Sequence, residues 1–132
     1  MKILVVDDER DIQTLFEQQF RKEIKNNLVD LVFAFSGEEA LTYLENNEHE
    51  AVLILSDINM PGMSGLELLR NIKQTYVKPP PVVMMMTAYG DAENYNSAKQ
   101  LGADDFLTKP IEFSLLKEKL KIADNGQDLS SR

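Results

Sequence analysis

Five short apolar runs, each followed by a more polar segment, constrain this chain more than any other feature of its sequence. The runs at residues 2–6, 28–35, 51–56 and 82–86 have the length and apolar character of buried strands, and residues 104–107, which begin with two aspartates, are expected to form a short fifth strand. Strands that alternate with helices over short connections form parallel sheets with right-handed crossovers. The sequence therefore predicts an α/β protein, a doubly wound (βα)5 fold in which helices cover both faces of a five-stranded parallel sheet.

The segments between the runs have the spacing and the start signals of helices. Ser36 and Ser64 are each followed three residues later by a glutamate, Glu39 and Glu67, which is the pattern of a capping box. Helices are also expected from residue 12 to about 24 and from about 91 to 101. The inward residues of the helix from 12 to about 24 are expected to be Ile12, Leu15, Phe16, Phe20 and Ile24. A last helix near the end of the chain is expected to turn Phe113, Leu116 and Leu120 inward.

The size and composition of the chain indicate one domain and exclude several classes of function. Its 132 residues fit a single domain over residues 1–123, with a polar tail at 124–132 that is either a plain terminus or the start of a linker to an output domain. The absence of cysteine excludes disulfides and thiolate sites, and it fits a cytoplasmic location. A net charge of −8 disfavours direct contact with nucleic acid, and no apolar run is long enough to span a membrane.

The residues that follow the apolar runs carry the chemistry. In open parallel sheets, ligands bind beyond the carboxyl ends of the strands. Asp7 and Asp8 follow the first run, Asp57 the third, Thr87 the fourth and Lys109 the fifth. Three carboxylates, one hydroxyl and one ammonium are therefore expected to meet at one edge of the sheet.

Clustered carboxylates at this edge need positive charge. Like charges about 4 Å apart repel by about 4 kcal/mol at an effective dielectric constant near 20, and Lys109 supplies only one compensating charge. A set of oxygen ligands without histidine or cysteine favours Mg²⁺, for which Mn²⁺ could substitute. Such a site would hold a phosphoryl group on a carboxylate nucleophile, for which Asp57 is the best placed residue.

Four segments together resemble the receiver domains of two-component response regulators, of the chemotaxis-regulator type. These segments are residues 5–9 (VVDDE), 57–65 (DINMPGMSG), 86–88 (MTA) and 109–110 (KP), and the resemblance extends from residue 1 to about 123. It implies a flavodoxin-like strand order of 2-1-3-4-5, a bacterial phosphorelay, and transfer of a phosphoryl group from a phosphohistidine of a sensor histidine kinase or phosphotransfer protein to Asp57.

The resemblance also implies a role for each site residue. Asp8 would bind Mg²⁺ directly, Asp7 directly or through water, and Asp57 and the backbone carbonyl of Asn59 would complete the protein ligands. Thr87 would bond a phosphate oxygen after transfer, and Lys109, before a Pro110 commonly joined by a cis bond in this family, would pair with Asp57 or with the phosphate.

The same resemblance implies a conformational switch and its readout. Phe106 matches the switch aromatic, whose ring turns inward once Thr87 moves; because phenylalanine has no hydroxyl, only packing can favour the buried rotamer. The face made by the helix near 91–101, the strand near 104–107 and the last helix would then meet an output domain or partner. Whether the chain forms a homodimer stays open.

Two other functions share parts of this pattern. An aspartate-dependent Mg²⁺ phosphohydrolase would place its nucleophile after the first strand and carry a cap, whereas Asp57 follows the third and no insertion provides a cap. A nucleotide- or flavin-binding module would need a glycine-rich loop after the first strand, and no such loop follows it in this sequence. The chain is thus expected to be a switch that catalyses only its own phosphotransfer and slow dephosphorylation. His49, its only histidine, is expected to be a solvated loop residue rather than a catalytic base.

Overall fold

Five parallel strands form a single sheet at the centre of the molecule. The computed structural model describes residues 1–48, 50, 52–76 and 81–121. The strands are β1 (Lys2–Val6), β2 (Asp30–Ala34), β3 (Val52–Asp57), β4 (Val82–Ala88) and β5 (Asp105–Lys109), and they lie in the order β2-β1-β3-β4-β5. All neighbouring pairs are parallel. The predicted fold class and strand order are confirmed.

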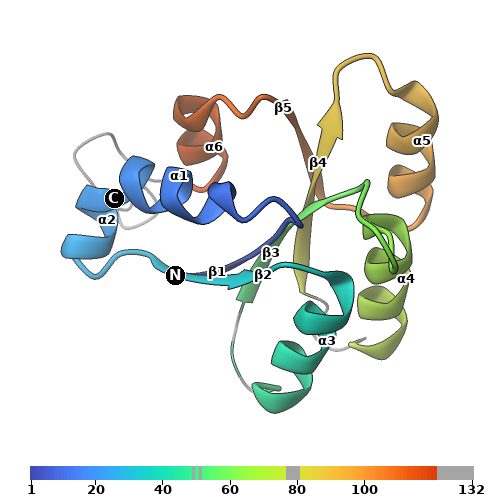
Figure 1. Cartoon of the computed structure of the whole chain (residues 1–132), viewed down its shortest axis with the longest axis horizontal. Helices are drawn as coiled ribbons and strands as arrows, with labels where there is room; N and C mark the ends of the chain where they lie inside the picture. Colours follow the sequence, from blue (N-terminus) through green and yellow to red (C-terminus); the bar gives the residue numbers. More distant parts are fainter. Residues whose placement is uncertain (49, 51, 77–80, 122–132) are drawn as a thin grey trace.

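Six helices cover the two faces of this sheet. They are α1 (Asp11–Gln19), α2 (Arg21–Lys25), α3 (Gly37–Asn46), α4 (Gly65–Thr75), α5 (Ala92–Gln100) and α6 (Phe113–Lys119). Helices α1, α2 and α6 lie on one side of the sheet, and α3, α4 and α5 lie on the other (Figure 1). Both predicted capping boxes form: the hydroxyl of Ser36 accepts the Glu39 N–H at 3.0 Å, and that of Ser64 accepts the Glu67 N–H at 3.2 Å.

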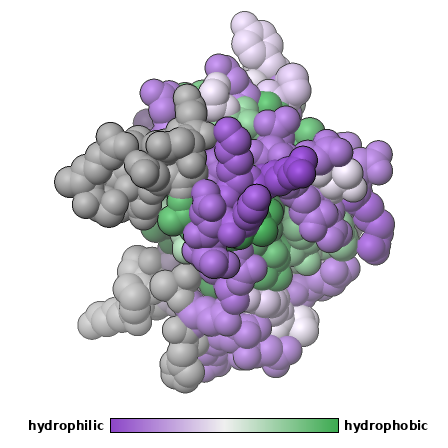
Figure 2. All heavy atoms as spheres, turned by 90° about the vertical axis from the view of Figure 1, so that its left-hand side faces the viewer, coloured by the Kyte–Doolittle hydropathy of each residue, from purple (hydrophilic) through white to green (hydrophobic). Residues whose placement is uncertain are grey.

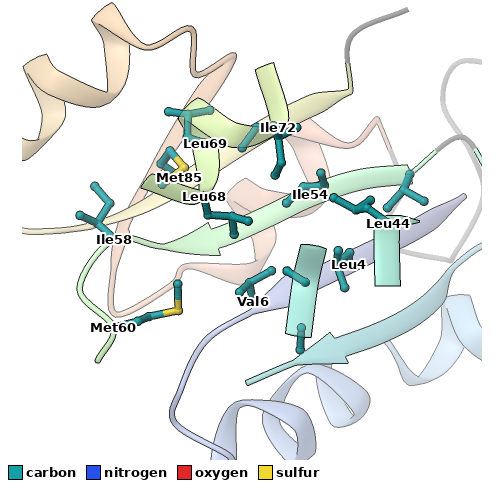
Figure 3. Packing of buried hydrophobic residues seen from close by; sticks show 14 of the residues in the cluster. Leu4, Val6, Leu44, Ile54, Ile58, Met60, Leu68, Leu69, Ile72 and Met85 are labelled. Carbon is teal, nitrogen blue, oxygen red and sulfur yellow. The ribbon is translucent and has the colours of Figure 1, made fainter. Parts of the chain in front are cut away.

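Alternate residues of the central strands supply two separate apolar layers. Leu4, Val6 and Ile54 pack toward α3 and α4, where Figure 3 shows them against the inner residues of those helices. Ile3 and Val5 point to the other face, onto α1 and α6. Because both faces are covered, the central strands β1 and β3 are apolar over most of their length, as the continuous runs in the sequence predicted.

The predicted single helix from residue 12 to 24 is wrong, because the chain breaks at Phe20 (φ −102°, ψ 17°) into α1 and α2. The break keeps the Phe20 ring buried, 6.0 Å from Phe16 and 6.2 Å from Phe113 between centroids. It also turns the following residues, so that Ile24, expected inside, is 37% exposed and Glu23 is fully buried. Leu15, also expected inside, is 41% exposed.

Strand boundaries differ from the predicted ones mainly at turns. The backbone N–H groups of Leu28 and Val29 both donate to the carbonyl of Glu23, which places these residues in the turn before β2 rather than in the strand. Strands β3 and β4 continue one and two residues further than expected, to Asp57 and Ala88. The expected strand start at Ala51, the tail at 124–132 and His49 lie outside the described residues.

The surface on the α1 and α2 side is hydrophilic over most of its described area, with apolar atoms visible between the polar side chains (Figure 2). Within the described part of the chain, none of the helices combines the length and the apolar character needed to cross a bilayer.

Candidate functional site

The carboxyl ends of β1, β3, β4 and β5 bring the predicted site residues together. The N–H of Asp7 donates to the carbonyl of Ala34 at 3.1 Å, which extends the β1 ladder by one residue beyond the strand. Asp57 is the last residue of β3 and pairs with Met86 of β4. Asp7 is fully buried, and Asp57 and Thr87 are each 7% exposed. Ionisable and polar groups this deeply buried require partners or a ligand.

Three carboxylates form one cluster at this edge. One oxygen from each of Asp7, Asp8 and Asp57 lies within 4.8 Å of the others. Asp8 is exposed while its two neighbours are buried, so the cluster is open to solvent on one side. The donor set consists of oxygens alone, which fits a hard divalent cation such as Mg²⁺. Asn59, two residues after Asp57, is exposed between the buried residues Ile58 and Met60, in the loop from β3 to α4.

Lys109 bridges two of the carboxylates. Its ammonium lies 2.8 Å from Oδ2 of Asp7 and 3.2 Å from Oδ2 of Asp57, and the Lys109–Pro110 peptide bond is cis. Burial lowers the pKa of the Lys109 ammonium, but the hydrogen bond to Asp7 and the charge of Asp57 outweigh it, so the pKa lies above its ordinary value. Lys109 is therefore a fixed positive charge at the site.

Asp57 has the environment of a reactive carboxylate. Burial raises the pKa of the Asp57 carboxyl above its usual value, and the negative charge of Asp7 adds to that effect, while Lys109 and the Ile58 N–H oppose it. The Ile58 N–H donates to Oδ1 at 2.9 Å and Lys109 lies on Oδ2, so both oxygens are oriented. A partly desolvated carboxylate held in one orientation is suited to nucleophilic attack.

The start of α4 presses directly against the backbone that carries Asp57. The N–H of Gly65 donates to the carbonyl of Ile58 at 2.7 Å. A Cβ atom at position 65 would overlap the Asp57 carbonyl oxygen and lie 2.7 Å from the Cα of Ile58. Only glycine permits this approach, and it fixes the path of the chain just after Asp57.

Thr87 and Phe106 lie on neighbouring strands. The Thr87 hydroxyl donates a long hydrogen bond of 3.5 Å to the carbonyl of Leu107, the residue next to Phe106. Phe106 is partly buried at the margin of the core beneath α3, α4 and α5. Tyr89, two residues after Thr87, is 91% exposed, so its ring makes no packing contribution to this core.

Three contacts near the site were not predicted from the sequence. Lys109 lies nearer to Asp7 than to Asp57, and the guanidinium of Arg10 covers the Phe35 ring, 4.4 Å from its centroid. These two contacts join residues far apart in the chain, so no local pattern signals them. The third is local: the side chain of Glu39 accepts a bond at 3.3 Å from the N–H of Phe35, and the capping-box pattern at Ser36 and Glu39 is the signal that could have found it.

Comparison with known protein families identifies the family to which this chain belongs. A family model described as "Response regulator receiver domain" matches residues 3–121. The chain belongs to the response regulator receiver domain family. The resemblance noted in the sequence is therefore confirmed, and so is the function of this family, a phosphoacceptor switch.

Curated relatives and solved structures agree with this assignment. The receiver domain is 37% identical over 121 residues to "Response regulator RppA" of Synechocystis, a match covering 92% of this chain and 49% of RppA. It is 38% identical over 110 residues to "Transcriptional regulatory protein CpxR" of Klebsiella pneumoniae, covering 83% of this chain and 43% of CpxR. The chain thus spans about half or less of the length of these two curated relatives.

A solved receiver domain protein from Clostridium thermocellum superposes on the fold with a TM-score of 0.76. The two are 30% identical, and the match covers 89% of this receiver domain and 88% of the other chain. The likeness therefore extends over nearly the whole of both molecules.

Proposed function

We propose that Asp57 of this receiver domain accepts a phosphoryl group from a phosphohistidine of a sensor histidine kinase or phosphotransfer protein. The observation that carries the proposal is the position of Asp57: its carboxylate is nearly buried, oriented by Ile58 and Lys109, and grouped with Asp7 and Asp8. In the step, an Asp57 oxygen forms a bond to phosphorus, the bond from phosphorus to the histidine nitrogen breaks, and that nitrogen keeps the electron pair.

Asp7, Asp8, Asp57 and the backbone carbonyl of Asn59 are the proposed ligands of Mg²⁺, or of Mn²⁺ in its place. When bound, the ion would neutralise negative charge on the carboxylates and on the incoming phosphoryl oxygens. The open side of the cluster at Asp8 leaves room for that group.

The remaining site residues are proposed to stabilise the phosphorylated form. Lys109 already bridges Asp7 and Asp57, and its ammonium is positioned to pair with a phosphate oxygen on Asp57. Among the described residues, the Thr87 hydroxyl makes one long bond, to Leu107, which it can exchange for a phosphate oxygen. That exchange would release Thr87 from β5 and allow Phe106 to turn inward.

The output of the switch is proposed to be the face made by α5, β5 and α6, which would contact an output domain or effector protein. We further propose that the domain works in the bacterial cytoplasm, in keeping with its lack of cysteine. It is proposed to turn over only its own phosphoryl group, and not an external substrate, because the site serves a single covalent acceptor.

Incubation with acetyl phosphate and Mg²⁺ tests the proposal. We expect one phosphoryl group per chain by intact mass, none after Asp57→Asn, and none when EDTA replaces Mg²⁺. Asp30→Asn, a change at an exposed carboxylate on β2, is the matched control and should leave the modification intact. Rapid release of phosphate over many turnovers would instead identify a phosphohydrolase and contradict the proposal.

A further inference from the structure

Two aromatic rings meet at the margin of the core, one from α5 and one from β5. The ring centroids of Tyr95 and Phe106 are 4.3 Å apart, with their planes inclined by 41°. Phe106 is partly buried at this margin, and Tyr95 is 39% exposed. The two rings are therefore in close, tilted contact where α5 packs against β5.

The contact is important because α5 has few other attachments to the core. Ala98 is the only buried residue among the nine of this helix. Its start is fixed by Asp91, whose Oδ1 accepts the Asn94 N–H at 3.2 Å and whose own N–H donates to the carbonyl of Ala88 at 3.2 Å. The middle of α5 is thus held mainly by Ala98 and by the stack of Tyr95 on Phe106.

The same pair of rings is linked to Thr87 of the proposed site through the backbone of β5. The Thr87 hydroxyl donates to the carbonyl of Leu107, the residue next to Phe106, and Phe106 pairs with Met85 two residues before Thr87. Phe106 has no hydroxyl, so packing alone decides which rotamer it occupies. Part of that packing is provided by the ring of Tyr95.

We propose that Tyr95 is a positioning residue that holds Phe106 in the position it has in this structure and thereby sets the switching equilibrium of this domain. The inference rests on the proposed function, in which Phe106 turns inward after phosphorylation of Asp57. Once Phe106 turns inward, its ring leaves Tyr95, so the stack stabilises only the unphosphorylated conformation. A contact that favours one of two states biases the population toward it, and its removal favours the other.

The test measures the ratio of phosphorylated to unphosphorylated domain at a fixed, subsaturating concentration of acetyl phosphate with Mg²⁺. Tyr95→Leu removes the ring and is expected to raise this ratio by about three- to tenfold, the range of an aromatic pair. Tyr95→Phe keeps the ring and should behave like the wild type. In a Phe106→Leu background, Tyr95→Leu should have no further effect.

Each outcome of this test either supports or overturns the proposed role of Tyr95. An unchanged ratio in Tyr95→Leu, or an equal increase with and without Phe106, would overturn the role of Tyr95 while leaving the proposed function intact. A wild-type domain that accepts no phosphoryl group would instead refute the proposed function, and the inference with it. Urea unfolding checks that each variant is folded. If Tyr95→Leu does not fold, Tyr95→Met, which retains apolar volume, replaces it, and the same increase in the ratio of phosphorylated to unphosphorylated domain is expected.

Discussion

The ammonium of Lys109 lies 2.8 Å from the carboxylate of Asp7, closer than its 3.2 Å distance to Asp57. Lys109 and Asp7 are 102 positions apart in the chain. The contact joins the end of β5 to the end of β1 across the top of the sheet. In this arrangement, one positive charge partly neutralises two buried carboxylates, which are also proposed ligands of Mg²⁺.

Replacement of Lys109 by methionine should therefore affect metal binding and phosphorylation in opposite directions. Loss of a nearby positive charge should strengthen Mg²⁺ binding by about threefold or more. Loss of the charge that would face the phosphoryl group should slow phosphorylation by acetyl phosphate by at least about tenfold. Calorimetric Mg²⁺ titration and intact-mass time courses measure the two effects. Lys119→Met, which removes an ion pair to Asp105 outside the site, should change neither.

Asp57→Asn should stabilise the metal-free protein at neutral pH. The folded pKa of Asp57 is raised, chiefly by burial, so its ionised form costs free energy of folding that the amide does not. We therefore expect the free energy of unfolding of Asp57→Asn at pH 7 to exceed that of the wild type. As pH falls through the folded pKa, wild-type Asp57 takes up a proton and the gain shrinks, vanishing below the unfolded pKa near 3.8. Urea unfolding in EDTA over this pH range would contradict the prediction if the gain stayed constant or grew at low pH.

Gly65→Ala should be destabilising although alanine favours helices. The added Cβ would overlap the Asp57 carbonyl oxygen, and backbone atoms cannot move aside without displacing the nucleophile. We expect a loss of about 2–3 kcal/mol and slower phosphorylation.

Gly37→Ala is the matched control for this prediction, because Gly37 also follows a capping serine at the start of a helix. Its Cβ would meet only the flexible side chain of Met63, 2.8 Å from the sulfur. We expect a loss below about 1 kcal/mol there. Equal losses at both positions would show that the approach of Gly65 to Asp57 is not what requires glycine.

The buried ion pair between Glu23 and Lys117 makes a prediction about stability alone. The Lys117 ammonium lies 2.9 Å from Oε2 of Glu23, which is fully buried and accepts no well-directed hydrogen bond within the described residues. Glu23→Ala should cost about 3 kcal/mol because it leaves a largely buried cation unpaired.

The double change Glu23→Leu with Lys117→Met should lie within about 1 kcal/mol of the wild type, because apolar residues of similar size avoid the cost of burying both charges. Chemical unfolding measures both variants. A double variant as unstable as Glu23→Ala would mean that the pair itself, rather than burial of an unmatched charge, supplies the stability.

The alternation of strands and helices and the positions of the strand ends could be predicted from the sequence, because both follow from short-range patterns. Burial on both sheet faces makes β1 continuously apolar, and parallel strands place Asp7, Asp57, Thr87 and Lys109 at one edge whatever the details of the loops. Ser36 and Ser64 marked two helix starts because capping is a local interaction.

Contacts between distant segments could not be predicted in this way. The helix break at Phe20 coincides with packing of its ring on Phe113, some 90 residues later, and Ile24, expected inside, is exposed. The stack of Tyr95 on Phe106 likewise depends on how α5 lies against β5. Apolar spacing shows which face of a helix is buried only while the helix is continuous.

Mapping of the modified residue tests the central claim most directly. The domain is phosphorylated with acetyl phosphate and Mg²⁺, treated with borohydride, which reduces an acyl phosphate to the alcohol, and analysed by peptide mass spectrometry. The account predicts that homoserine replaces aspartate at position 57 alone and that EDTA prevents the change. Reduction at Asp7 or Asp8 instead, or equal modification with and without Mg²⁺, would contradict it.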